Sequence, residues 1–129
     1  MYENIKLLSE EELTLKNELD RKYGDQGLSE EEMKIFENLL SRNAAIGSVF
    51  LHLLDVNNKT PEENKLFNEC FQNLMADNKL KAKNKDIEQL SKQVERLNNA
   101  IDLQPLGALL LYAYSEELKE RTKANERTI

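Results

Sequence analysis

The segment from Ser29 to Asp55 is the feature that most restricts how this chain can fold. Its apolar residues recur every three or four positions, which places them on one broad face of a long helix. The members of this face are Phe36, Leu39, Leu40, Ile46, Gly47, Phe50, Leu53 and Leu54. Because a helix of this kind is stable only when its apolar face is covered, the sequence predicts that other helices pack around it.

Three segments begin with the same arrangement of residues. Ser9, Ser29 and Thr60 are each followed, three positions later, by a glutamate. In such a capping box the hydroxyl accepts a hydrogen bond from the glutamate's amide, and the carboxylate accepts one from the amide of the cap. We therefore expect a helix to begin at each of these positions, with Pro61 suited to the first turn of the third.

A heptad pattern marks the second half of the chain. Its members are separated by alternating steps of three and four residues, and we call them the heptad seam: Ile87, Leu90, Val94, Leu97 and Ile101. β-branched residues at one heptad position and leucine at the other favour a two-stranded parallel coiled coil. Two alternatives remain open, because the seam can join two copies of the chain in a homodimer or pack against the last helix of the same chain.

The sequence as a whole predicts an all-α bundle of about five helices, with a short coiled-coil-like segment at 80–101. The expected helices cover residues 9–23, 29–55, 61–76, 79–101 and 105–123. Pro105 disfavours helix at Gln104, which separates the last two. A length of 129 residues suits one domain, with residues 1–8 as a lead-in and 124–129 as a frayed tail.

The residues that carry most enzyme chemistry are scarce in this chain. It contains one cysteine, Cys70, and one histidine, His52. Cys70 falls within the apolar stripe of its segment, which is typical of a buried structural thiol, whereas His52 lies off the main apolar face. Because neither a zinc site nor a Glu-x-x-His pair can be formed, we expect no catalytic residues, no metal and no cofactor.

The chain carries a net charge of −6, but its charges are unevenly distributed. Lysines stand at alternate positions in one short run: Lys79, Lys81, Lys83 and Lys85. Residues 79–101 contain 6 basic and 3 acidic side chains, a net of +3, which leaves −9 for the remainder. A regulator that contacts nucleic acid through the basic face of 79–96 is therefore one hypothesis, although this segment lacks aromatic side chains that would stack on bases.

A protein-binding role is the leading hypothesis from the sequence. We expect a small acidic module without enzymatic activity that binds another protein as an adaptor, a chaperone-like subunit or an inhibitor. A structural homodimer built on the heptad seam is a further alternative. The longest apolar run, Leu106 to Tyr114, is too short to cross a bilayer, and a single cysteine fits a reducing compartment, so we expect a cytoplasmic protein with no membrane contact.

Overall fold

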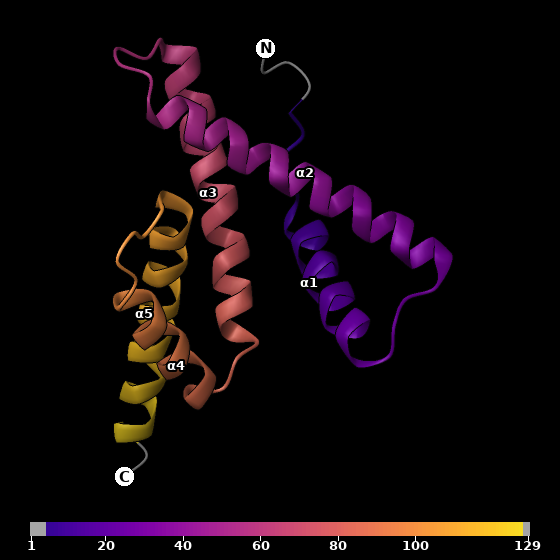
Figure 1. Cartoon of the computed structure of the whole chain (residues 1–129), viewed down its shortest axis with the longest axis vertical. Coiled ribbons are helices and arrows are strands. Elements are labelled where there is room, and N and C mark those ends of the chain that lie inside the picture. Colours follow the sequence, from indigo (N-terminus) through magenta and orange to yellow (C-terminus); the bar gives the residue numbers. More distant parts are fainter. Residues whose placement is uncertain (1–4, 128–129) are drawn as a thin grey trace. The chain divides into compact units, whose positions relative to one another are not determined.

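The structure is a computed structural model that describes residues 5–127, and every regular element in that range is an α-helix (Figure 1). The helices are α1 (Glu10–Asp25), α2 (Glu30–Leu54), α3 (Pro61–Lys83), α4 (Ile87–Asn98) and α5 (Pro105–Arg127). The all-α class and the five packed helices predicted from the sequence are confirmed. No helix in the described range is long and apolar enough to cross a membrane.

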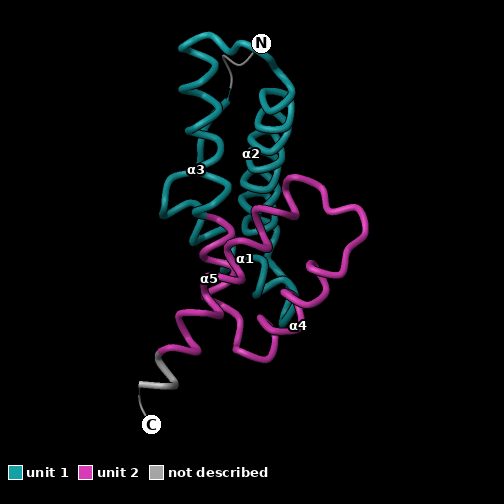
Figure 2. Tube along the Cα trace, turned by 90° about the vertical axis from the view of Figure 1, so that its left-hand side faces the viewer, with its two compact units in different colours: residues 1–76 teal, residues 77–129 magenta. Residues whose placement is uncertain are grey.

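The chain divides into two compact units, residues 1–76 and residues 77–129 (Figure 2). We call them unit 1 and unit 2. The division falls inside α3, so this helix contributes its first part to unit 1 and its last part to unit 2. The expectation that all 129 residues fold as one domain stays a prediction.

The capping boxes expected at the first three helices are all present. At Ser9 the hydroxyl accepts from the Glu12 amide at 3.1 Å, and the Glu12 carboxylate accepts from the Ser9 amide at 3.0 Å. The same pair of bonds joins Ser29 to Glu32 and Thr60 to Glu63. Each box satisfies amide donors that a helix start leaves without partners inside the helix.

Unit 1 has its core on the apolar face of α2. Five α2 side chains are buried there, joined by leucines from the lead-in and α1 and by three side chains from α3: Phe36, Leu39, Ile46, Phe50, Leu53, Leu8, Leu13, Leu19, Cys70, Leu74 and Met75. The Phe50 ring stacks on Phe67 at 5.0 Å between centroids and lies 6.3 Å from Phe71. Leu40 and Leu54, which the sequence placed on the same face, are instead exposed.

The predicted boundary between the third and fourth helices is wrong. We expected one helix to end at residue 76 and the next to cover 79–101, but α3 continues to Lys83 and α4 covers only Ile87–Asn98. The physical reason is a fourth capping box: the Asp86 carboxylate accepts from the Gln89 amide at 2.7 Å, and the Gln89 side chain accepts from the Asp86 amide at 3.0 Å. A helix that begins after this cap cannot include residues 79–85.

Two other helix ends also differ from the sequence prediction. α1 ends at Asp25 rather than residue 23, and Gly27, with a φ of +81°, adopts the left-handed conformation that follows it. The amides of Gln26 and Gly27 both donate to the carbonyl of Lys22, at 2.9 and 3.0 Å. α5 continues to Arg127 instead of ending at 123. Residues 1–4 of the expected lead-in and 128–129 of the expected tail lie outside the described residues.

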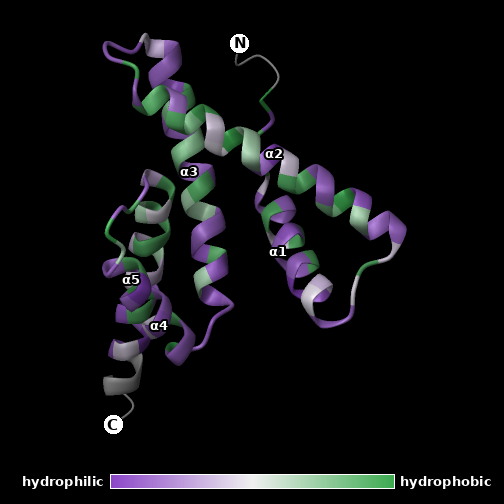
Figure 3. Ribbon diagram, in the orientation of Figure 1, coloured by the Kyte–Doolittle hydropathy of each residue, from purple (hydrophilic) through white to green (hydrophobic). Residues whose placement is uncertain are grey.

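Unit 2 is organised around the pairing of α4 with α5. Ala82, Leu90 and Tyr114 are buried together, and partly buried side chains pack against them: Val94, Leu97, Leu110 and Leu118. Figure 3 shows that hydrophobic residues of α5 concentrate in its first half, which supplies Leu110 and Tyr114 to this core. The result is a small apolar centre made by the end of α3, by α4 and by α5.

An arginine of α5 holds the end of α3 in place within unit 2. The Arg121 guanidinium donates to the carbonyls of Ala82, at 3.2 Å, of Lys83, at 2.9 Å, and of Lys85. Glu117 accepts from the Arg121 Nε at 3.0 Å and so orients the guanidinium. The last carbonyls of a helix have no partner inside it and carry partial negative charge. The cationic guanidinium therefore supplies hydrogen-bond donors to these carbonyls and also interacts favourably with the helix dipole.

Candidate functional site

The heptad seam does not form one continuous surface. Leu90 is fully buried, and Val94 and Leu97 are partly buried against the same unit 2 core. Ile87 is 37% exposed and Ile101 is fully exposed. Ile101 stands after the end of α4 at Asn98, so the helical register that aligned it with the seam does not extend to it.

The central seam residues pack against α5 of the same chain. The core they contact includes Tyr114, and Leu110 and Leu118 border it. This arrangement supports the alternative in which the seam is internal core. Self-association through the seam stays a prediction.

The run of lysines lies at the end of α3 rather than at the start of α4. Lys79, Lys81 and Lys83 belong to the last turns of α3, where positive side chains interact favourably with the helix dipole. The Lys81 ammonium lies 3.3 Å from the carboxylate of Asp77, which is buried. Lys85 follows the helix and places its ammonium 5.8 Å from the centroid of the Tyr114 ring. Two of the four lysines are therefore engaged within unit 2, and only Lys79 and Lys83 of the run are classed as exposed.

The single cysteine is buried, whereas the single histidine is exposed. Cys70 is fully buried in the unit 1 core, and this burial, with a smaller contribution from Glu69, raises the pKa of its thiol. A thiol with a raised pKa is a poor nucleophile at neutral pH. His52 is exposed in the last turn of α2. Across the residues that the structure describes, no three His, Cys, Asp or Glu side chains are grouped so that they can hold a metal ion.

The sequence reading missed an apolar surface at the connection between α4 and α5. Ile101, Leu103 and Leu106 are all exposed there, and we call them the connection patch. Leu103 folds over the first turn of α5, where a Cβ at Gly107 would lie 2.9 Å from the Leu103 Cδ1. Glycine at this position therefore makes room for the leucine. The signal in the sequence is the apolar residues on both sides of Pro105, but the heptad pattern assigns Ile101 to the seam.

Comparison with known proteins adds no relative from which a function can be transferred. No protein family model, no curated protein and no solved structure matches this chain. A function is therefore inferred from the side chains of the chain itself.

Proposed function

We propose that this chain is a small acidic helical module without enzymatic activity that binds another protein, as an adaptor, a chaperone-like subunit or an inhibitor. The observation that carries the proposal is the connection patch. Single exposed apolar residues are ordinary on a protein surface, but large apolar side chains that gather in one place mark sites of protein contact. Ile101, Leu103 and Leu106 are three exposed large apolar residues within six positions of the sequence.

The helices on either side of the connection patch are held in position by the unit 2 core. α4 is fixed before it by Leu97, α5 is fixed after it by Leu110, and both leucines pack against the unit 2 core. Leu103 is further restricted by its contact with the first turn of α5 at Gly107. Ordered flanking helices and a restricted Leu103 lower the conformational entropy that is lost when a partner binds, although the Ile101 side chain itself is fully exposed.

The charge of unit 2 supports an apolar contact rather than an electrostatic one. Residues 77–129 contain 10 Lys and Arg and 9 Asp and Glu, a net of +1. Such a nearly neutral unit provides little long-range attraction for nucleic acid, and Lys81 and Lys85 are already engaged. The nucleic-acid alternative stays a prediction, as do the homodimer and the cytoplasmic location.

The test compares two matched double variants in capture experiments from an extract of the native host. Ile101→Asp with Leu106→Asp places two charges in the connection patch, and we expect the captured partner to be lost. Ile35→Asp with Leu54→Asp makes the same chemical changes at exposed positions of α2, 47% and 41% exposed, and should keep the partner. Retention of the partner by the patch variant, or equal loss from both folded variants, would refute the assignment of the patch.

A further inference from the structure

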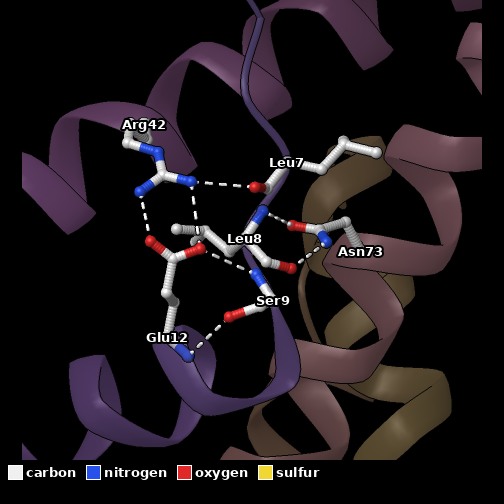
Figure 4. A network of polar contacts seen from close by, with 6 residues as sticks. All are labelled: Leu7, Leu8, Ser9, Glu12, Arg42 and Asn73. Atoms are coloured by element: carbon white, nitrogen blue, oxygen red, sulfur yellow. Dashed lines mark hydrogen bonds and ion pairs between the residues drawn. The ribbon is translucent and has the colours of Figure 1, made fainter.

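The segment before α1 is held to unit 1 mainly through its own backbone. We call residues 5–8 the strap. The Leu8 amide donates to Asn73 Oδ1 at 3.3 Å, and Asn73 Nδ2 donates to the Leu8 carbonyl at 2.8 Å (Figure 4). Arg42 Nη2 donates to the Leu7 carbonyl at 2.8 Å. One side chain from α3 and one from α2 thus bind three main-chain groups of two neighbouring residues.

Only one side chain of the strap is fully buried. Leu8 is 4% exposed, whereas Ile5 and Leu7 are half-buried and Lys6 is exposed. Main-chain hydrogen bonds are available to any extended peptide, and specificity in such sites comes from the side chains that enter pockets. The contacts that hold the strap therefore require an extended backbone and a leucine, and little else of its sequence.

One of the two side chains that bind the strap, Arg42, is also positioned by a contact outside the strap. The Arg42 guanidinium is fixed by the Glu12 carboxylate, at 2.5 and 3.1 Å, and Glu12 belongs to α1. Asn73 lies on α3, beside the buried Leu74. If the strap leaves, Arg42 keeps its ion pair with Glu12, and the Asn73 amide stays on its helix with its donor and acceptor available to an equivalent segment.

Charge restricts the kind of segment that fits. Residues 1–76 contain 8 Lys and Arg and 15 Asp and Glu, a net of −7. An acidic surface attracts basic peptides and repels acidic ones. The exposed Lys6 of the strap agrees with this preference.

We propose that Arg42, Asn73 and the surroundings of Leu8 form a site for an extended peptide of a partner protein, and that the strap occupies this site within the same chain. The peptide that fits has leucine at the position of Leu8 and a basic residue near it. The partner peptide exchanges with the strap, which acts as a built-in competitor. This site lies within unit 1 and is independent of the connection patch.

Competition by the strap has a measurable consequence. A segment tethered this closely has an effective concentration on the order of 1 mM. A peptide that binds the open site with a Kd of about 10 μM is then weakened roughly 100-fold in the intact chain. A substitution that removes the strap from the site should therefore strengthen the binding of added peptide.

The experiment measures the fluorescence anisotropy of a labelled peptide with the sequence of residues 1–9, added to the full chain. Leu8→Asp should bind this peptide at least about 10-fold more tightly than the wild type does. Adding Asn73→Ala to Leu8→Asp should remove the gain. Leu15→Asp, at a leucine of α1 that is 38% exposed, is the matched control and should bind as weakly as the wild type.

Three outcomes overturn the proposal. The first is a folded Leu8→Asp variant that binds the peptide no better than the wild type. The second is unfolding of both Leu8→Asp and the milder Leu8→Ala, because the strap is then a fixed part of the core. The third is a wild-type dimer that dissociates when peptide is added, because the occupant is then a second copy of this chain and not a partner protein.

Discussion

Glu12 and Glu32 each belong to a capping box and, at the same time, form an ion pair. The pKa of Glu12 is lowered from 4.5 to about 2, first by its hydrogen bond with Arg42 and then by the Ser9 amide. The pKa of Glu32 is lowered to about 2 in the same way by Lys22, whose ammonium lies 2.6 Å from the carboxylate, and by the Ser29 amide. Each carboxylate is therefore charged wherever the protein is near neutral pH.

This pairing predicts a pH dependence of stability that Arg42 controls. A carboxyl whose pKa is lower in the folded state stabilises the fold above its unfolded pKa and loses that contribution as the pH falls toward its folded pKa. The window for Glu12 therefore runs from pH 4.5 down to about 2. Arg42→Met should destabilise the protein more at about pH 6 than at about pH 2.5 in urea unfolding. A destabilisation of equal size at both pH values would contradict this role.

The stacked aromatic rings predict where the unit 1 core is most sensitive. Phe50 is 4% exposed and contacts Phe67 and Phe71, so Phe50→Ala leaves a cavity that should cost about 3–5 kcal/mol of unfolding free energy. His52→Ala, two residues away on the exposed side, should cost no more than about 1 kcal/mol. Chemical denaturation of both variants measures the difference, and the reverse order would mean that α2 presents another face to the core.

At the scale of elements, helix starts were more predictable than helix ends. Ser9, Ser29 and Thr60 each stand three residues before a glutamate, and that local pattern is sufficient because capping depends on neighbours in the sequence. Asp86 and Gln89 form the same kind of capping box. The sequence prediction missed it because it extended one helix from residue 79 through the heptad that begins at Ile87. Residues 79–83 before this cap are all good helix formers, so they gave no reason to continue the third helix rather than to begin the fourth there.

The position of Asp86 predicts the sign of a mutational effect. Because Asp86 caps α4, Asp86→Ala should lower the free energy of unfolding of the protein by about 1 kcal/mol. Asp86→Ser should leave it nearly unchanged, because serine is also a good cap. In the middle of a helix over 79–101 the same alanine would instead stabilise by about 0.5 kcal/mol, because alanine is the better helix former. Urea unfolding of both variants distinguishes a cap from a position inside a helix. An Asp86→Ala variant that is more stable than the wild type would mean that one helix covers 79–101.

At the scale of the whole molecule, apolar periodicity identified the faces but not their partners. The stripe on α2 predicted a core, and five of its eight members are among the buried hydrophobic residues, because a wide apolar face is buried whichever helix covers it. The heptad seam allowed both an internal and an intermolecular partner, and the sequence contained nothing to choose between them. The connection patch was not predictable, since exposure at Ile101 depends on where α4 ends and on what the tertiary packing leaves uncovered.

The centre of the heptad seam, Leu90, Val94 and Leu97, is core of unit 2, whereas Ile101 at its end is exposed in the connection patch. Val94→Asp with Leu97→Asp, followed by circular dichroism and analytical ultracentrifugation, tests this most directly. Because both side chains pack against the core that contains Leu90 and Tyr114, we expect the pair to lose helix and cooperative unfolding. Ile87→Asp with Ile101→Asp changes exposed seam residues and should keep the fold. A dimeric wild type that the Val94 and Leu97 substitutions convert into a fully folded monomer would contradict this assignment and make the seam an interface between two copies.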